Sequence, residues 1–166
     1  MKHFFCKMNQ MRFLHVGIVT TLIMVSCAAS KKASVRDMKV DRVISSARAF
    51  IGTPYKYGGT SRSGMDCSGL LINSFKAIQV SLPRKSEDQS KVGMEIKMKD
   101  LAPGDLVFFA TGNKKRKITH VGMVTEVKGK DEVKFIHASS SLGVVETNIY
   151  ADYYQKRFRG ARRVIN

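Results

Sequence analysis

One cysteine and two histidines are the residues of this sequence best suited to chemistry. The chain has three Cys and four His, but beyond residue 37 only Cys67, His120 and His137 remain. A thiol hydrolase needs this set, with sulfur as nucleophile and an imidazole that takes the thiol proton and later protonates the leaving amine. A buried inert Cys with structural His residues would give the same count, so the count alone leaves both interpretations open.

The segment around Cys67 predicts where its sulfur lies. Residues 64–69 are Gly-Met-Asp-Cys-Ser-Gly, and Asp66 is a typical N-cap of a helix. Cys67 would then lie in the first turn, where unpaired backbone N–H groups and the positive end of the helix dipole favour thiolate over thiol. The same N–H groups can stabilise an oxyanion. The buried face of this helix is expected to contain Leu70, Leu71, Ser74, Phe75 and Ile78.

Two strand-like segments, at about 119–127 and 132–139, would bring the two histidines together as a hairpin. If the loop holds an even number of residues with Gly129-Lys130 at its tip, Gly122 lies opposite His137, and His120 projects from the same face. Gly122 would leave space for one imidazole to reach the other. His137 could then hold His120 in the useful tautomer, as a carboxylate does in other triads. An odd-residue loop or a bulge would put the two rings on opposite faces.

The remaining pattern predicts helices first and strands afterwards. One helix is expected from Asp37, as its cap, to Ile51, and Ser86 with Gln89 predicts a capping box for a short helix ending near Gly93. A turn at residues 103–105 opens an apolar strand Leu106–Ala110. Further strands are expected at Val144–Ile149 and Arg162–Ile165. This order indicates an α+β domain, with N-terminal helices packed on an antiparallel sheet.

The N-terminus has the composition of a bacterial lipoprotein signal. Residues 1–26 hold three basic residues, no acidic one and an apolar run of about 13 residues, too short for a bilayer. Small residues flank Cys27, so we predict a signal peptide over 1–26, a lipidated Cys27 with a tether over 27–37, and one enzyme domain over 38–166. Ordinary signal cleavage with an incidental Cys27 is the alternative, and the true start Met stays open.

The chain is strongly basic, with a formal net charge of +16. Removing the leader with its three cations leaves +13, which attracts polyanions. No nucleic-acid motif is present, and we expect no nucleic-acid partner. Anionic wall polymers, lipid head groups and stem-peptide carboxylates fit an exported protein better. The simpler alternative is a solvated basic surface that keeps the protein soluble.

Six sequence blocks, taken in order, resemble the NlpC family of bacterial cell-wall cysteine peptidases. The resemblance runs from about residue 40 to the C-terminus, and its strength lies in the order of all six blocks. It implies a compact papain-like fold that hydrolyses peptidoglycan stem peptides beside diaminopimelate. Lipid-anchored members include murein endopeptidases that act on D,D-cross-links. The blocks are residues 53–59 (TPYKYGG), 66–69 (DCSG), 82–89 (LPRKS through Gln89), 103–109 (PGDLVFF), 120–122 (HVG) and 135–139 (FIHAS).

The resemblance also implies roles for individual residues. Cys67, His120 and His137 would be nucleophile, base and orienting residue. Tyr55 would place its hydroxyl near the reacting carbonyl. Pocket positions are matched by Asp66, Ser68 and Ser86. For Tyr55 the alternative is simple packing, and for Asp66 and Ser86 it is a capping role alone.

Three other functions remain open at this level. They are a catalytically inactive wall-binding module, a zinc site made by the same Cys and two His, and a cysteine acyltransferase on the same fold. For the peptidase we expect no metal or cofactor, a monomer, peptidoglycan stem peptides as partner, and membrane anchoring through Cys27 with the domain facing the periplasm or exterior. The bond cleaved, at D-Glu or D-Ala beside diaminopimelate, and the choice of inner or outer membrane are left open.

Overall fold

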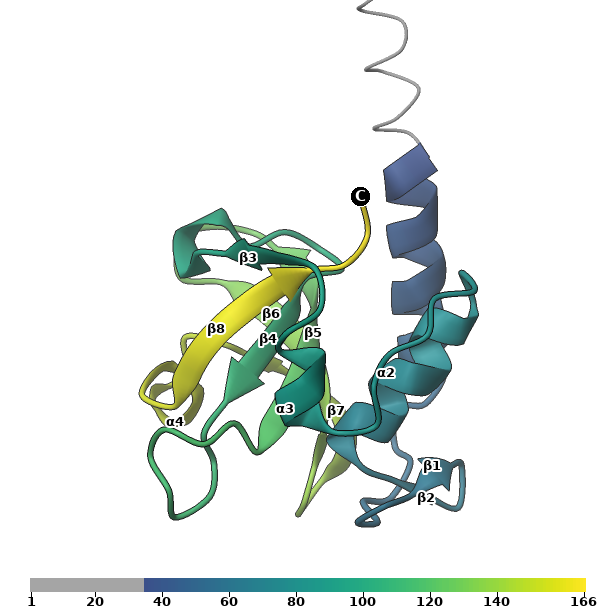
Figure 1. The fold of residues 1–166 in the computed structure, drawn as a ribbon, viewed down its shortest axis with the longest axis horizontal. Helices are drawn as coiled ribbons and strands as arrows, with labels where there is room; N and C mark the ends of the chain where they lie inside the picture. The colour runs from purple at the N-terminus through teal and green to yellow at the C-terminus, as the bar shows by residue number, and fades with distance from the viewer. Residues whose placement is uncertain (1–34) are drawn as a thin grey trace, which may run out of the picture. The chain divides into compact units, whose positions relative to one another are not determined.

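A computed structural model of the chain describes residues 35–166. The predicted leader and Cys27 lie outside these residues, as does the predicted tether up to residue 34. The fold described below belongs to the unit Met38–Asn166. In Figure 1 the N-terminal helix and the helix after it (labelled α2) lie on one side of a sheet, and the predicted α+β architecture is confirmed.

The first helix covers residues 35–48 of the described chain. It therefore includes residues 35 and 36, which we assigned to the tether, and Asp37, which is helical rather than a cap. The helix also ends before Ile51. Residues 49–52 form turns instead, in which Gly52 adopts φ +84° and donates its N–H to the carbonyl of Val144 at 3.0 Å. The backbone of Gly52 can take this conformation because it lacks a Cβ.

Helix α2 (Cys67–Lys76) begins at the predicted residue, with Asp66 as its N-cap. Helix α3 (Ser86–Gln89) is shorter than expected, and its N-cap is Lys85, without a side-chain cap. The predicted capping box is therefore wrong. The fully buried Gln89 side chain instead donates to the carbonyls of Pro83 (2.8 Å) and Ser68 (3.4 Å). This amide ties the segment before α3 to the start of α2.

The main sheet has six strands in the order β3-β8-β4-β5-β6-β7, and every pairing is antiparallel. The predicted strands over the two histidines, the apolar block and Val144–Ile149 are confirmed to within a residue or two. The last strand starts four residues earlier than predicted, because residues from Phe158 onward pair with the strand of the apolar block, with Phe158 opposite Phe109. The strands are β3 (Met94–Ile96), β4 (Leu106–Phe109), β5 (His120–Val127), β6 (Val133–Ser139), β7 (Gly143–Asn148) and β8 (Phe158–Arg163).

Several short elements have no counterpart in the prediction. Besides β3, they are the hairpin β1 (Thr60–Ser61) and β2 (Gly64–Met65), the 3₁₀ helix η1 (Met98–Asp100) and helix α4 (Asp152–Gln155). All have four residues or fewer, which is too short for a periodic pattern to develop.

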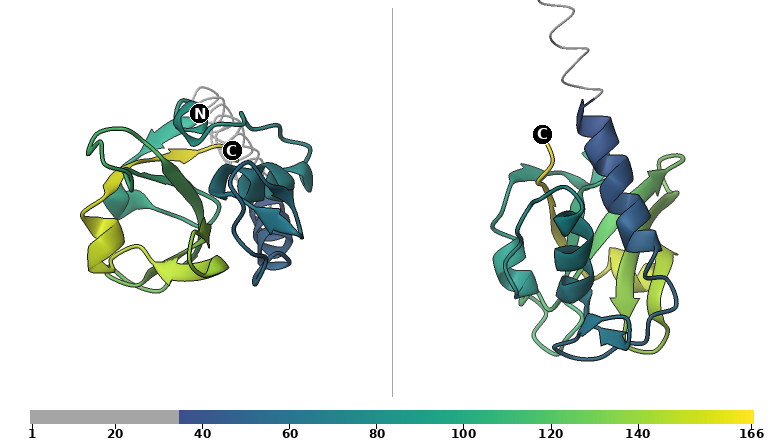
Figure 2. Two further views of the ribbon diagram at one scale, coloured as in Figure 1. Left: turned by 90° about the horizontal axis from the view of Figure 1, so that it is seen from below. Right: turned by 90° about the vertical axis from the view of Figure 1, so that its right-hand side faces the viewer.

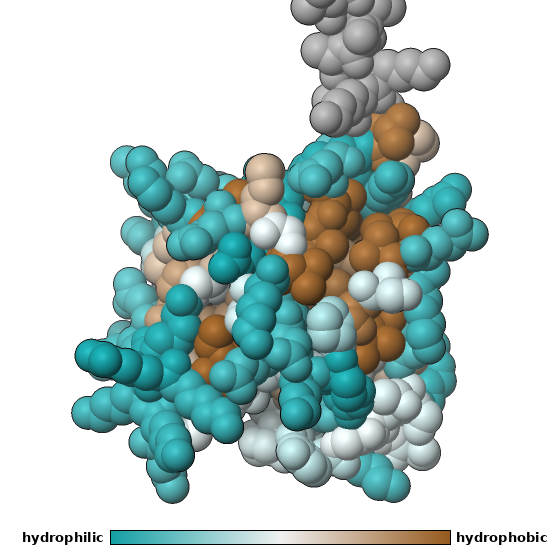
Figure 3. All heavy atoms as spheres, in the orientation of Figure 1, coloured by the Kyte–Doolittle hydropathy of each residue, from teal (hydrophilic) through white to brown (hydrophobic). Residues whose placement is uncertain are grey.

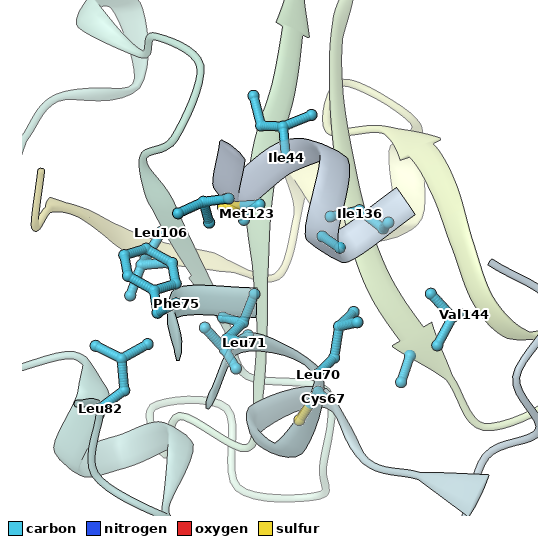
Figure 4. Packing of buried hydrophobic residues seen from close by; sticks show 14 of the residues in the cluster. Ile44, Cys67, Leu70, Leu71, Phe75, Leu82, Leu106, Met123, Ile136 and Val144 are labelled. Carbon is cyan, nitrogen blue, oxygen red and sulfur yellow. The ribbon is translucent and has the colours of Figure 1, made fainter. Parts of the chain in front are cut away.

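Apolar side chains form two separate clusters, one on each side of the sheet. The first joins the N-terminal helix and α2 to β4, β5, β6 and β7, and Figure 4 shows Leu70 and Leu71 of α2 among Ile44, Met123 and Ile136. The second fills the opposite side, with Val107, Phe109, Val124 and Phe135 as members and Tyr154 and Phe158 packed against them. Figure 2 shows the sheet curving around this second side, away from the helices. His120 is the first residue of β5.

Candidate active site

Cys67 lies at the head of α2, held by its capping residue. The Asp66 carboxylate accepts the backbone N–H of Gly69 at 2.7 Å, and a Cβ at Gly69 would come 2.4 Å from the carbonyl oxygen of Gly59. Only glycine therefore fits this turn. The Cys67 side chain is mostly covered, with the residue 8% exposed.

The electrostatics at this sulfur differ from our prediction. Burial raises the pKa of the Cys67 thiol, and although the backbone N–H groups of Val121, Ser68 and Cys67 itself act the other way, the net direction is upward. The expected preference for thiolate is therefore wrong for the resting site, because desolvation of the sulfur outweighs the helix N-terminus. A neutral thiol needs a base that removes its proton during attack.

The buried Asp66 forms an ion pair with the partly exposed Arg84, which the sequence analysis missed. The Arg84 guanidinium binds both carboxylate oxygens, at 2.9 and 2.6 Å, and it also donates to Ser68 Oγ at 2.7 Å. Burial opposes the ionisation of Asp66, but the hydrogen bonds from Arg84 and Gly69 outweigh it, so the pKa of Asp66 lies below its usual value. Asp66 is thus both cap and pocket residue. The sequence held no signal for Arg84 beyond its place in the LPRKS block.

His120 and His137 are hydrogen-bonded, as predicted. His120 Nε2 lies 3.0 Å from His137 Nδ1, and the rings meet edge to face with centroids 5.0 Å apart. Met123 of β5 pairs with Ile136 of β6, so that Gly122 lies opposite His137. This is the predicted register.

That register arises from two irregularities that cancel. Val127 pairs with Val133, so residues 128–132 form an odd loop instead of the expected even one. Between Val124 and Glu126 the register shifts by one residue, leaving Thr125 as a bulge. Either irregularity alone would have turned the histidines to opposite faces. Together they restore the face on which both rings project.

Gly122 has a different role from the one predicted. The space beside it is filled by Phe135 rather than by an imidazole, since a Cβ at Gly122 would lie 2.5 Å from Phe135 Cδ2 and 2.7 Å from the Ile136 carbonyl oxygen. Phe135 in turn stacks on His137, with ring centroids 4.7 Å apart and 18° between planes. Gly122 thus fixes the orientation of His137 through an intervening ring.

We expect Gly122→Ala to destabilise the protein by about 1–3 kcal/mol, because the added methyl overpacks a filled site, and to lower any activity that depends on His137. Urea unfolding gives the free energy of unfolding. Gly129→Ala in the same hairpin is the matched control, since a Cβ there meets nothing within 4 Å. Equal stability of the two variants would contradict this role for Gly122.

His137 has further partners that the sequence analysis did not identify. Its Nε2 lies 3.2 Å from Thr147 Oγ1 and 3.3 Å from the Tyr154 hydroxyl. Tyr154 comes from the short helix α4 and Thr147 from β7, and neither has a local sequence signature. With a proton on His137 Nε2, its Nδ1 accepts from His120 Nε2–H. His120 Nδ1 is then the ring nitrogen that can accept a thiol proton.

Both imidazoles are held in the neutral form. Burial lowers the pKa of His120 to about 4, and burial followed by the charge of His120 lowers the pKa of His137 to about 3. His137 is 1% exposed. A neutral His120 is the form that can act as a base.

The burial of two neutral histidines predicts that the protein loses stability at acid pH. Below pH about 6.5 these histidines bind protons in the unfolded chain but stay neutral in the folded chain. The free energy of unfolding therefore falls as the pH decreases towards about 4, by up to about 1.4 kcal/mol per pH unit for each His. Above pH about 6.5 the contribution is constant. Urea unfolding of the wild type and of His137→Gln should give a shallower pH slope for the variant. Identical slopes would contradict the burial of a neutral His137.

Two adjoining pockets open on either side of Cys67. One, of about 560 Å³, is lined by Asp66, Ser68, Arg84 and Ser86. The other, of about 600 Å³, is lined by His120, Ala138, Thr147, Tyr154 and residues 139–142. Cys67, Tyr55 and Thr119 line both, so the thiol and His120 share one pocket.

All the predicted pocket residues therefore lie at this cleft. Tyr55 is partly buried beside the thiol, and burial, then the charges of Cys67 and Asp66, raise the pKa of its hydroxyl. Ser86 starts α3 and lines the first pocket without capping the helix. Within residues 35–166, no three His, Cys, Asp or Glu side chains form a group that could hold a metal ion.

The sequence and the fold have clear relatives. Residues 52–163 match the NlpC/P60 family. The chain is 35% identical over 161 residues to the probable endopeptidase NlpC of Escherichia coli (strain K12), covering 93% of this chain and 100% of that protein. It is 34% identical over 134 residues to the murein DD-endopeptidase MepS/murein LD-carboxypeptidase of the same strain, covering 80% of this chain and 67% of that protein.

Solved structures of this family share the fold. An NlpC/P60 family protein from Bacillus cereus ATCC 10987 superposes with a TM-score of 0.67 at 32% identity, covering 76% of this chain and 40% of that one. A protein described as similar to lipoprotein, of the NLP/P60 family, from Staphylococcus aureus subsp. aureus Mu50 gives 0.67 at 35% identity, covering 78% and 42%. This chain thus spans less than half the length of either. The predicted papain-like fold is confirmed.

Proposed function

Because the chain belongs to the NlpC/P60 family of peptidoglycan hydrolases, we propose that it is a cysteine endopeptidase that cleaves stem-peptide or cross-link amide bonds next to diaminopimelate. Cys67 is the nucleophile, His120 the base and His137 the residue that orients it. The observation that carries this proposal is the 3.0 Å contact between His120 Nε2 and His137 Nδ1, together with the pocket that both His120 and Cys67 line.

The chemistry follows from the neutral resting state. His120 Nδ1 takes the thiol proton as the sulfur attacks the scissile carbonyl, and backbone N–H groups at the head of α2 stabilise the oxyanion. The tetrahedral intermediate collapses to a thioester while His120 gives its proton to the leaving amine. A water molecule, deprotonated by the same imidazole, then attacks the thioester and releases the acid and the thiol. His137 stabilises the imidazolium through its acceptor nitrogen.

The pocket residues have different roles in substrate binding. Tyr55 contributes its hydroxyl beside the reacting carbonyl. Ser68 and Ser86 offer hydroxyls to the acyl part of the substrate in the first pocket. The Asp66 carboxylate accepts hydrogen bonds from Arg84 and from backbone N–H groups. These bonds fix the wall of that pocket and orient the Arg84 guanidinium towards the substrate.

Digestion of purified diaminopimelate-type peptidoglycan tests the proposal. Mass spectrometry of the products is expected to show new termini at an amide bond of diaminopimelate, and the identity of those termini distinguishes cleavage after D-Glu from cleavage after D-Ala. An acyltransferase would instead join the acyl part to an added amine. Unchanged muropeptides, under conditions where Cys67 is reduced, would contradict the proposal.

We also propose that the protein is held at the cell envelope by acylation of Cys27. The small residues around Cys27 and the short apolar run before it support this. Within the described residues, no helix is long and apolar enough to cross a bilayer.

Cys27→Ser is therefore expected to move the protein from the membrane to the soluble fraction, because it removes the acceptor of the lipid. Immunoblots of fractionated cells measure this, with Cys67→Ser as the matched control that leaves the anchor intact. A Cys27→Ser protein that still sediments with membranes would contradict acylation.

A further inference from the structure

A basic surface lies beside the cleft and is not used by the proposed chemistry. The loop between β4 and β5 carries four consecutive cations, and β8 begins next to it, since Arg159 Nε donates to the Lys115 carbonyl at 2.7 Å. Ala110 N–H likewise donates to the Arg157 carbonyl at 2.9 Å. We call this set the basic surface; it consists of Lys114, Lys115, Arg116, Lys117, Arg157 and Arg159.

The charge of the basic surface is not neutralised locally. Among the described residues, no ion pair joins any of its six cations to a carboxylate. Arg159 donates to the carbonyls of Lys115, Lys156 and Phe158. Arg157 donates to the Tyr153 carbonyl and lies 3.9 Å over its ring. Asp152 is already paired with Lys156 at 2.9 Å. A concentration of uncompensated cations of this kind attracts polyanions.

The loop has a defined conformation at its base. Thr119 Oγ1 accepts the N–H groups of Thr111 (3.0 Å) and Gly112 (3.1 Å), and Lys117 N–H donates to the Lys114 carbonyl at 3.0 Å. The loop is thus closed next to His120, and its residues 114–117 are all exposed. Figure 3 shows long hydrophilic side chains extending from the region where Figure 1 draws this loop and the start of β8.

The basic surface borders both halves of the cleft. Lys117 lines the pocket that holds Ser68 and Arg84. Tyr153, which carries Arg157 on its ring, lines the pocket that holds His120. An anionic polymer bound to the basic surface can therefore extend directly into the cleft. This position favours the substrate polymer over an unrelated partner such as a membrane.

We propose that the basic surface is an exosite that binds carboxylates of the peptidoglycan polymer beyond the scissile bond. The inference rests on the proposed function, because stem peptides with free carboxylates are then the polyanion that enters the cleft. Exposed cations gain little from any single carboxylate, but several act together on a polymer with repeated charges. The exosite would therefore raise affinity for intact peptidoglycan and leave small fragments unaffected.

Binding is tested without catalysis, in Cys67→Ala protein. Sedimentation with purified sacculi compares Lys114→Gln/Lys115→Gln/Arg116→Gln with a control, Lys97→Gln/Lys99→Gln/Lys130→Gln. The control removes the same charge from residues outside the basic surface. We expect at least a tenfold weaker affinity for the first variant and less than a twofold change for the control. Raising NaCl from about 50 to about 300 mM should remove most of the difference. Sacculi whose carboxylates have been amidated should bind both variants equally.

Equal losses in the two variants would overturn the exosite in favour of a net-charge effect. A loss of binding to anionic phospholipid vesicles but not to sacculi would also overturn it and indicate a membrane surface. In otherwise wild-type protein, the first variant should cleave sacculi about tenfold more slowly and a soluble muropeptide at the normal rate. If unmodified protein cleaves neither substrate, the proposed function fails, whereas the binding experiment still decides the exosite.

Discussion

Cys67→Ala is expected to reduce muropeptide cleavage by more than about 10³-fold. Without sulfur no thioester can form, and only substrate positioning and the backbone N–H groups at the head of α2 remain. The change should alter stability little, because the thiol is a small group at the edge of the first apolar cluster. The measurement is the initial rate of product formation from a purified cross-linked muropeptide.

Two controls make the Cys67 result specific. Urea unfolding of Cys67→Ala should give a free energy of unfolding within about 1–2 kcal/mol of wild type, and the variant should still sediment with sacculi. Turnover within tenfold of wild type by folded Cys67→Ala would exclude Cys67 as nucleophile. Loss of turnover together with unfolding would call for Cys67→Ser, which keeps a polar group of similar size.

His120→Gln is expected to lower the rate by about 10² to 10⁴-fold, the range typical of general acid–base catalysis. The thiol pKa is raised by burial, so at neutral pH the sulfur depends on His120 for deprotonation. The rate of the variant should therefore rise with pH above neutrality, as hydroxide generates the thiolate that the missing imidazole no longer provides. Rates between pH 6 and about 9.5 measure this.

His137→Gln is the matched comparison for His120→Gln. Its amide can still approach His120 Nε2, but it cannot reproduce the Thr147 and Tyr154 contacts of the ring. We expect a smaller loss, of about 10 to 10²-fold, with the pH profile of the wild type preserved, because the base itself is present. A larger loss in His137→Gln than in His120→Gln would reverse the roles assigned to the two histidines.

The sequence predicted the candidate site better than it predicted the contacts around it. It identified Cys67 at the head of α2 because the capping aspartate and the apolar spacing act over a single helical turn. It placed β5 and β6 because their alternation is also local. The pairing of the histidines was predicted correctly from an even loop, yet the structure reaches it through an odd loop and a bulge. The hydrophobic pattern of the sequence does not reveal whether the loop is odd or even, or whether a strand contains a bulge.

The sequence itself therefore determined which side chains could react and which short segments carry them, since capping and periodicity depend on neighbours within a few residues. Tertiary structure alone decided the burial that raises the thiol pKa, and the pairing of Arg84 with Asp66. It also decided the Thr147 and Tyr154 contacts to His137 and the ring that fills the space at Gly122. These features arise between residues brought together from different elements. Their energies come from desolvation and close packing, which a linear pattern does not contain.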